Sequence, residues 1–263
     1  MYGVLYVVAT PIGNREDWSV RAQRVLGEVE LLLCEDTRHT LKLLDRYGIR
    51  VALGSYHDFN EAERAQEVVR KLRAGARVAL VSDQGTPAIS DPGYRLVRLC
   101  RQESIPVIPV PGPSAAIAAL SVSGLPTTEF HFVGFLPSRR EARRRKLESL
   151  KRHTATLIFY EAPHRLEASL DDLADILGDR LAFVAREMTK VHEEYLFGRI
   201  SEVRAGVRPR GEAVIVVSGA GAEAEEEGPG FDLAQASRQE VLRTIARRLG
   251  VSRKDLYDAL YRK

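Results

Sequence analysis

Short apolar runs alternate with amphipathic segments along the first half of the chain. The runs at 4–9, 30–34, 51–55, 78–81 and 106–110 have the pattern of strands that are covered on both faces of a parallel sheet. The segments at 19–26, 40–47, 62–74, 94–102 and 115–120 have the pattern of helices. Repeated strand-plus-helix units of this kind predict a mostly parallel α/β sheet.

The second half of the chain has a different order of elements. Strands are predicted at 130–136, 155–160, 181–185, 195–199 and 213–218, with helices at 138–152 and 166–177, and the close spacing of the last strands predicts antiparallel pairs. Residues 219–230 read GAGAEAEEEGPG, an acidic flexible linker, and the helices predicted at 237–249 and 253–261 have the outline of a helix-turn-helix. We therefore predict four parts: an N-terminal α/β domain (1–115), a C-terminal α/β domain with a mixed sheet (116–219), the linker (220–230) and a helical tail (231–263).

Turn-forming and small polar residues follow the apolar run at 78–81. The stretch SDQGTPAISDPG places the Asp83 carboxylate beside the bare backbone of Gly85. Open parallel sheets bind ligands just beyond the carboxyl ends of their strands, so we predict a binding loop here. A tight connection into the next helix is the alternative, but a plain connection usually needs only about 2 to 6 residues.

Polar residues also follow other predicted strands. Glu35, Asp36, Thr37, Arg38 and His39 come directly after the second strand, where Asp36 or Thr37 could simply cap the next helix. A cap does not account for all five. His57 follows the third strand, and it either lines the same cleft or is an ordinary surface or core histidine.

Composition narrows the class of protein. The chain has 263 residues, 44% hydrophobic and 29% charged, with a net charge of +3 that is too small to indicate a nucleic-acid partner by itself. Its two cysteines, Cys34 and Cys100, have no spacing that suggests a disulfide or a zinc site, which fits a reducing cytoplasm. The apolar run near the amino terminus is too short for a membrane span, so we expect no membrane partner. We also expect no bound metal, because the cysteines lack the spacing of a zinc site.

Basic residues gather in the predicted helix at 138–152. This segment has eight basic and two acidic residues and lacks the opposite charges at i+4 spacing that a solvated helix face usually carries. An anionic polymer is therefore the expected partner, with these candidate contacts: Arg139, Arg140, Arg143, Arg144, Arg145 and Lys146. The tail has eight basic and four acidic residues, so Arg253 and Lys254 are candidate RNA contacts too, unless its helices dock on the main body.

Eight motifs, taken in order, resemble one bacterial family. They are Thr10-Pro-Ile-Gly-Asn14, Glu35-Asp-Thr-Arg-His39, Ser55-Tyr-His57, Ser82-Asp-Gln-Gly-Thr-Pro87, Ser90-Asp-Pro-Gly-Tyr94, Pro111-Gly-Pro-Ser114, Phe159-Tyr-Glu-Ala-Pro-His-Arg165 and Arg186-Glu187. Together they resemble ribosomal RNA small-subunit methyltransferase I, a family of the tetrapyrrole-methylase superfamily. Gln84 and Ala88 depart from the small residues that this family more commonly has there, and Gln84 could alter the fit around the cofactor.

The resemblance implies a fold, an activity and a set of site residues. It implies two α/β domains of the tetrapyrrole-methylase type, a homodimer, and transfer of a methyl group from S-adenosylmethionine to the ribose 2'-oxygen of a decoding-centre cytidine in 16S rRNA. The first strand is not followed by GxGxxG, so an ordinary Rossmann methyltransferase is not expected. The residues that the resemblance implies for the cofactor are Pro11, Gly13, Asp83, Gln84, Gly85, Thr86, Pro113, Ser114, Ala115, Phe159, Tyr160, Gly211, Glu212 and Ala213.

Methyl transfer to a hydroxyl is an in-line displacement, so positioning comes first and a nearby base helps. The candidate catalytic residues are Asp36, Arg38, His57, Glu161 and His164, with Arg38 available for a phosphate or a carboxylate. Two other functions stay open. One is methylation of a small molecule, which would not explain the basic cluster. The other is a non-catalytic RNA-binding module, which would not explain the polar loops at the strand ends.

Overall fold

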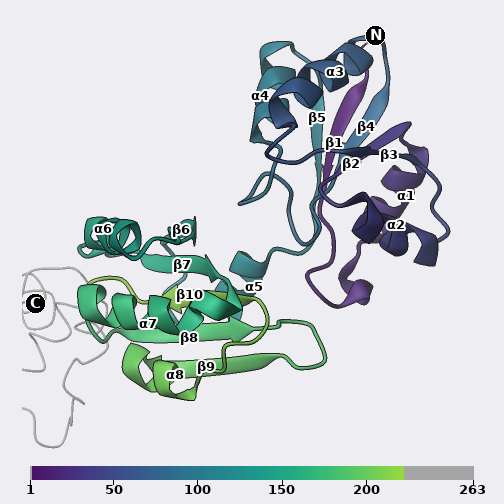
Figure 1. Ribbon diagram of the computed structural model, residues 1–263. Coiled ribbons are helices and arrows are strands. Elements are labelled where there is room, and N and C mark those ends of the chain that lie inside the picture. Colours follow the sequence, from purple (N-terminus) through teal and green to yellow (C-terminus); the bar gives the residue numbers. More distant parts are fainter. Residues whose placement is uncertain (1, 222–263) are drawn as a thin grey trace, which may run out of the picture. The chain divides into compact units, whose positions relative to one another are not determined.

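The computed structural model describes residues 2–221. The predicted helical tail, with Arg253 and Lys254, and the linker after residue 221 lie outside the described residues. Residues 1–220 form one compact unit. This unit contains two five-stranded sheets (Figure 1).

The first sheet is entirely parallel, as predicted. Its strands are β1 (Val4–Val8), β2 (Leu31–Cys34), β3 (Ala52–Ser55), β4 (Arg77–Leu80) and β5 (Val107–Val110), in the order β3-β2-β4-β1-β5. Helices α1 (Val20–Glu28) and α2 (Thr37–Arg46) pack on one face, and α3 (Glu61–Arg73) and α4 (Tyr94–Gln102) pack on the other. A short 3₁₀ turn, η1 (Arg15–Asp17), precedes α1. Covering both faces explains why these strands read as unbroken apolar runs.

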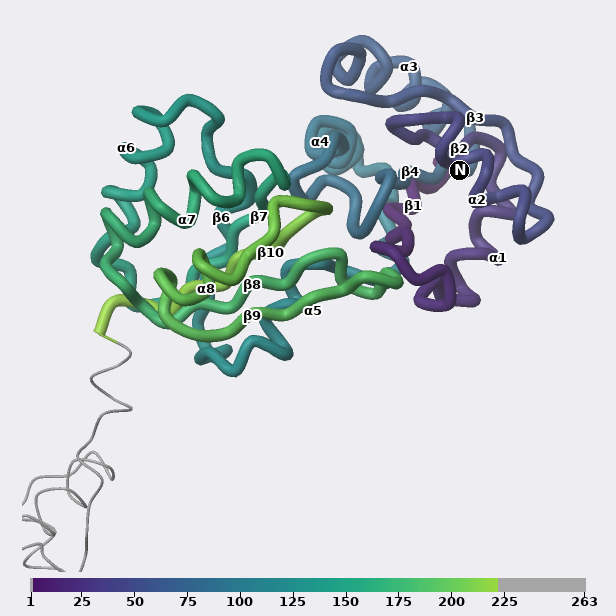
Figure 2. Tube along the Cα trace, turned by 60° about the horizontal axis from the view of Figure 1, so that its bottom comes forward, coloured from purple at the N-terminus to yellow at the C-terminus, as the bar shows by residue number. Residues whose placement is uncertain are grey.

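The second sheet is mixed, also as predicted. It contains β6 (Phe130–Phe135), β7 (Thr156–Glu161), β8 (Leu181–Arg186), β9 (Glu194–Arg199) and β10 (Ala213–Val217), in the order β6-β7-β10-β8-β9. Only the β6–β7 pair is parallel. Helices α6 (Arg140–Leu150), α7 (Pro163–Leu177) and α8 (Ile200–Gly206) pack on one face, and α5 (Ala115–Val122) packs on the other (Figure 2).

Capping residues set several helix boundaries. Ser19 Oγ accepts a hydrogen bond from Ala22 N at 3.1 Å and starts α1, as predicted. Helix α2 begins three residues earlier than predicted, because the Asp36 carboxylate accepts from the backbone N–H groups of Arg38 (2.8 Å) and His39 (3.3 Å). Helix α8 was not predicted, and Glu202 stabilises its start by accepting from Arg199 N at 2.8 Å.

The strand order brings three loops of the first sheet together. Strands β4, β1 and β5 are neighbours, so the loops at their carboxyl ends lie at one edge of the sheet. Thr10 N donates to Gly85 O at 2.8 Å, and Gly85 N donates to Thr10 O at 3.2 Å, which joins the loops after β1 and β4. Thr86 Oγ1 donates to Pro113 O at 3.0 Å, which joins the loops after β4 and β5.

Candidate cofactor and substrate site

A cavity of about 560 Å³ lies at this edge, a size typical of small-molecule sites. The second sheet contributes the strand ends of β6, β7 and β8, the segments that follow β7 and β8, and the start of β10. The predicted site residues that line the cavity are Asp83, Gln84, Gly85, Thr86, Ser114, Ala115, Tyr160, Glu161, His164, Glu212 and Ala213. Residues far apart in sequence therefore meet at one cavity.

A second, smaller cavity of about 240 Å³ shares lining residues with the first. Two predicted cofactor residues, Pro11 and Gly13, line this smaller cavity. It also has a basic wall made by Arg15, Lys42 and Lys190. The loop after β1 thus lies beside the main cavity, and its neighbours could attract an anion.

Asp83 is half-buried and lines both cavities. Its Oδ1 atom accepts a hydrogen bond from Asp36 N at 3.2 Å, which ties the loop after β4 to the start of α2. Because Asp83 is held by a backbone N–H, its carboxylate keeps a fixed position and retains lone pairs for a ligand.

Asp91 also lines the main cavity, although only its motif, and no role for the residue itself, was predicted from the sequence. Burial, helped by the nearby Glu35, Asp83 and Asp58 carboxylates, raises the pKa of Asp91 to about 7, while a hydrogen bond with Ser82 opposes this rise. A carboxyl with a pKa near neutrality can accept a proton at physiological pH.

Glu187, Lys190 and Glu212 form a charged group on one wall. Lys190 Nζ lies 2.9 Å from Glu187 Oε1 and 3.0 Å from Glu212 Oε2. Burial by itself lowers the pKa of Lys190, but its hydrogen bonds with the two carboxylates outweigh burial and hold the pKa above its usual value. With its nitrogen toward Glu212, the Gln84 side-chain amide donates to Glu212 Oε2 at 2.9 Å.

Gly211 makes room for this group. It has φ +68°, and a Cβ atom there would lie 2.2 Å from Glu187 Cγ. Gly211 does not line the cavity, and its missing side chain leaves room for that of Glu187; its predicted contact with the cofactor stays a prediction. Pro113 does not line the cavity either, although its carbonyl accepts the Thr86 hydroxyl.

Tyr160 and Glu161 come from the end of β7. The Tyr160 hydroxyl accepts from Ala116 N at 3.2 Å, and burial raises the pKa of Tyr160. Glu161 is 1% exposed: Oε1 lies 2.6 Å from Arg165, and Oε2 accepts from Ser169 Oγ at 2.5 Å. A carboxylate with both oxygens engaged holds the loop in place and is poorly suited to accept a proton.

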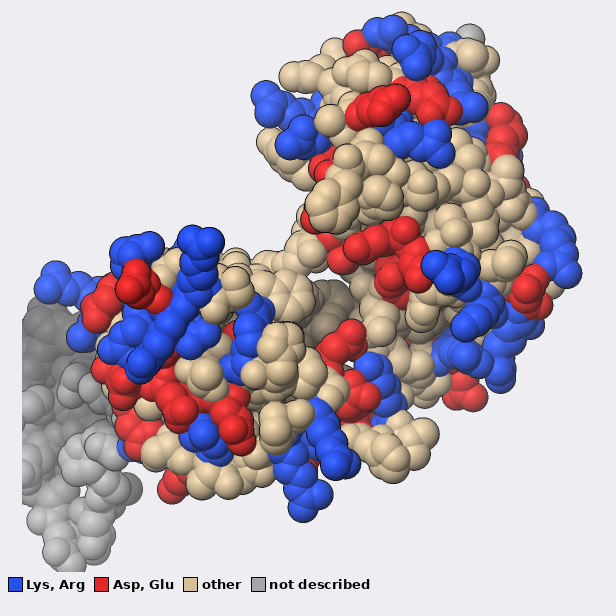
Figure 3. Space-filling view, in the orientation of Figure 1, with Lys and Arg blue, Asp and Glu red and all other residues tan. Residues whose placement is uncertain are grey.

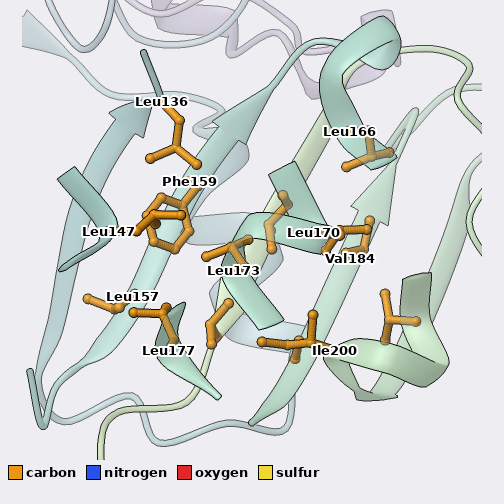
Figure 4. Close-up of a cluster of buried hydrophobic side chains, with 14 of the residues drawn as sticks. Leu136, Leu147, Leu157, Phe159, Leu166, Leu170, Leu173, Leu177, Val184 and Ile200 are labelled. Carbon is orange, nitrogen blue, oxygen red and sulfur yellow. The ribbon is translucent and has the colours of Figure 1, made fainter. Parts of the chain in front are cut away.

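The Phe159 side chain does not line either cavity. It is fully buried and packs in the core of the second sheet beside Leu136 and Leu147 (Figure 4). Neighbouring residues on a strand point to opposite faces, so when Tyr160 lies at the cavity, Phe159 points into the α6–α7 side. The Phe159 side chain therefore has a core position, and a contact of this residue with the cofactor stays a prediction.

Three predicted catalytic residues do not line either cavity: Asp36, Arg38 and His57. Asp36 caps α2, and the hydrogen bonds from Arg38 N and His39 N hold its pKa below the usual value. His57 is half-buried, and its Nε2 lies 3.2 Å from the Asn60 amide. His164, by contrast, is exposed and lines the main cavity.

The basic helix contains a buried ion-pair cluster. Arg143 is 5% exposed and lies 2.7 Å from Asp172 on α7, which also accepts from Arg144 at 2.7 Å and Arg140 at 3.3 Å. Figure 3 shows acidic side chains beside the basic ones on the face that carries α6 and α7. The missing opposite charges thus come from a neighbouring helix, and the prediction that Arg143 contacts RNA is corrected.

Several site residues had no strong local signal in the sequence. Besides Asp91, they include Phe135, Glu187 and Lys190. The ISDPG motif and the RE pair after β8 marked two of these segments, but burial by other elements gives the residues their character. Within residues 2–221 there is no group of three or more His, Cys, Asp or Glu side chains arranged to hold a metal ion.

Comparison with known proteins defines the protein family to which the chain belongs. Residues 4–204 match the model of the family described as Tetrapyrrole (Corrin/Porphyrin) Methylases. Two solved structures share the fold: the methyltransferase CobJ, with TM-score 0.62 and 19% identity over 83% of this chain and 95% of that one, and uroporphyrin-III C-methyl transferase from Thermus thermophilus complexed with S-adenyl homocysteine, with TM-score 0.57 and 23% identity over 82% and 97%.

Relatives with higher sequence identity identify the family within the tetrapyrrole methylases. Ribosomal RNA small subunit methyltransferase I from Halalkalibacterium halodurans is 43% identical over 99% of this chain and 96% of its own length. The protein of the same name from Thermotoga maritima is 48% identical over 82% of this chain and 99% of its own length. The chain therefore belongs to the ribosomal RNA small subunit methyltransferase I family, within the tetrapyrrole methylases.

Proposed function

We propose that the protein transfers a methyl group from S-adenosylmethionine to the ribose 2'-hydroxyl of a decoding-centre cytidine in 16S rRNA. The observation that carries this proposal is the cavity of about 560 Å³, which is lined by loops at the carboxyl ends of strands in a chain of the ribosomal RNA small subunit methyltransferase I family. The site of action would be the cytoplasm, which fits the two buried free cysteines.

The cavity's residues fit this cofactor. Asp83 and Glu212 offer carboxylates to a ligand that carries an ammonium and a sulfonium, and Gly85 exposes bare backbone for close approach. Buried apolar side chains at the cavity, such as Met188 and Val214, suit an adenine ring. When bound, S-adenosylmethionine supplies an electrophilic methyl group.

The protein's own task is to position the ribose and take up its proton. Asp91 is the proton acceptor that the geometry supports best, because it lines the cavity and its pKa is raised to about 7. The groups that face Asp91 are the carboxylates of Glu35, Asp58 and Asp83 and the phenol of Tyr160. His164 remains the second candidate at the cavity.

RNA would be held by the basic residues that have no buried partner. Arg139, Arg145 and Lys146 are exposed on or beside α6, so their charges are available to phosphates. Arg15 and Lys42 at the smaller cavity could add a phosphate contact close to the reaction site.

A homodimer is supported by exposed apolar side chains on the second sheet. Ile117 and Val122 on α5 are 50% and 58% exposed, and Phe197 on the edge strand β9 is 57% exposed. Phe197 lies within 4.0 Å of a Cβ atom placed at Gly124, just after α5, so these side chains are near one another. Sedimentation at several concentrations tests the assembly, and a monomer throughout would refute it.

Labelled S-adenosylmethionine tests the reaction. The protein is incubated with unmethylated small ribosomal subunits, with naked 16S rRNA and with a small-metabolite extract, and the labelled RNA is hydrolysed in alkali. A 2'-O-methyl group blocks cleavage at the adjacent phosphodiester, so the expected product is an alkali-resistant dinucleotide that carries the label. Label in a mononucleotide or only in a small metabolite would contradict the proposal.

A further inference from the structure

Two large apolar side chains are exposed at the rim of the main cavity. Phe135, at the end of β6, is 53% exposed, and Ile89, in the loop after β4, is 46% exposed. They are the exposed large apolar residues that line this cavity within residues 2–221. Single exposed apolar residues are common, but two at the rim of one ligand cavity indicate a contact surface.

A β-bulge directs Phe135 toward the cavity. Phe132 and Phe135 both lie edge-on to the ring of Tyr160, with centroids 5.0 Å and 5.5 Å away. Residues three apart in a regular strand point to opposite faces. The register of β6 against β7 shifts between Phe132 and Gly134, and this extra residue places both phenylalanines on the face of Tyr160.

Gly134 and Ser90 place Phe135 and Ile89 at the same rim. Gly134 has φ +75°, and a Cβ atom there would lie 2.9 Å from Ser90 Oγ, so the two segments touch. Ser90 itself has φ +63°, a conformation that costs energy for a residue with a side chain. Because Ile89 precedes Ser90 and Phe135 follows Gly134, the close approach holds the two apolar side chains at one rim.

The surroundings indicate what binds there. The cavity interior already has buried apolar side chains for the cofactor, whereas Phe135 is half open to solvent and meets a group that enters from outside. Four residues later, Arg139 is exposed at the start of the basic helix. Unpaired RNA bases stack on aromatic side chains, and arginine binds phosphate. Phe135 and Arg139 could therefore contact the base and a phosphate of the same RNA strand.

The geometry points to Phe135 and Ile89 as the surface on which the base of the target nucleotide stacks, beside the cavity where its ribose is methylated. This inference rests on the proposed function and adds the residues that hold the base. The base would be turned out of its stack to reach the rim, because a stacked base has no free face to offer to Phe135.

The test compares Phe135→Ala with Phe135→Trp, which keeps an aromatic face, and with Phe135→Leu, which keeps apolar volume without one. Phe130→Ala is the matched control, because Phe130 is on the same strand, 42% exposed, and does not line the cavity. For each variant, kcat/KM on small subunits, affinity for small subunits by filter binding, and affinity for S-adenosylmethionine by calorimetry are measured.

We expect Phe135→Ala to lower kcat/KM and subunit affinity by about 5- to 100-fold, the range for losing one base–aromatic stack. Phe135→Leu should show most of this loss, Phe135→Trp and Phe130→Ala should behave like the parent, and cofactor affinity should not change. Equal kcat/KM for the parent and Phe135→Ala would overturn the inference. A loss of cofactor affinity in Phe135→Ala would overturn it too, because the ring would then belong to the cofactor's site. A parent that labels no ribose refutes the proposed function instead, and the stacking surface with it.

Discussion

Replacing Asp172 by alanine should destabilise the second sheet's domain strongly while leaving the site's residues in place. Asp172 is 1% exposed and accepts from three arginines of α6, of which only Arg143 is buried. Removing the carboxylate leaves the Arg143 guanidinium, 5% exposed, without its partner. Breaking a buried pair by removing one member costs about 3–5 kcal/mol.

The other two arginines change this magnitude little. The Arg140 side chain is 71% exposed, so its pair with Asp172 contributes at most about 1 kcal/mol. Arg144 keeps a second carboxylate, Asp175, at 3.0 Å. For the compact unit of residues 1–220, about 1 kcal/mol shifts the unfolding midpoint by about 2–4 °C, so we expect Tm to fall by about 6–20 °C.

Circular dichroism during heating measures the shift, and urea unfolding gives the free energy. Asp175→Ala is the matched control on the same helix: its side chain is 57% exposed, so a loss of about 1 kcal/mol or less is expected. Replacing both partners, with Arg143→Met and Asp172→Leu together, should recover most of the stability, because no charge is left buried. A loss in Asp172→Ala no larger than that in Asp175→Ala would refute the reasoning.

The same pair predicts a pH dependence. Burial by itself raises the pKa of Asp172, but the hydrogen bonds from Arg144, Arg143 and Arg140 outweigh it and hold the pKa below its usual value. A carboxyl with a lowered folded pKa stabilises the protein above its unfolded pKa of about 3.9, and the contribution is lost as pH falls through the folded pKa. The stability difference between parent and Asp172→Ala should therefore be full at neutral pH and shrink only in acid below about pH 4.

Three further changes test the site and its RNA contacts, and a fourth tests the tail. Asp91→Asn should lower the methylation rate and remove the rise in kcat/KM with pH that the parent should show around pH 7, the pKa of Asp91; a pH–rate profile of the variant that keeps this rise would exclude Asp91 as the base. Asp83→Ala should abolish S-adenosylmethionine binding in calorimetry without lowering Tm, because Asp83 lies in a loop at the cavity; parent-like binding would show that the loop does not hold the cofactor. Reversing the charges of Arg145 and Lys146, both exposed on α6, should weaken RNA binding and flatten its dependence on salt in filter-binding assays, and equal salt slopes would leave only a solvated helix face. A chain cut after Gly221 should still bind S-adenosylmethionine but methylate small subunits less well. An unchanged kcat/KM over a range of salt concentrations would show that the tail does not contribute to RNA binding.

Much of the fold could be predicted from local patterns. The helix from Tyr94 to Gln102 was predicted with the bounds that the structure has, and Ser19 caps α1 as expected. Strand β4 carries its apolar run because helices cover both faces of the sheet, and the loop after it, which lines the main cavity, follows from its turn-forming residues. These features depend on residues that are close together in the chain, so a periodic pattern or a cap is enough to indicate them.

The properties of individual site residues depended on contacts between distant segments. From the sequence, the basic residues of α6 had no acidic partners in their own helix. In the structure their partner is Asp172 of α7, which lies 29 residues after Arg143. Glu161 was predicted as a candidate base from the sequence. In the structure both oxygens of its carboxylate are engaged, one by Ser169 and the other by Arg165.

The sequence by itself determined where strands end, which loops are polar, and to which family the motifs are similar, because these are properties of short stretches. Only the tertiary structure decided that Asp91 is half-buried near other carboxylates, that a bulge directs Phe135 to the cavity rim, and that Arg143 is held inside the protein. The physical reason is that burial, the local dielectric and the partner of a charge are set by what packs around a side chain, and here those neighbours come from other strands and helices.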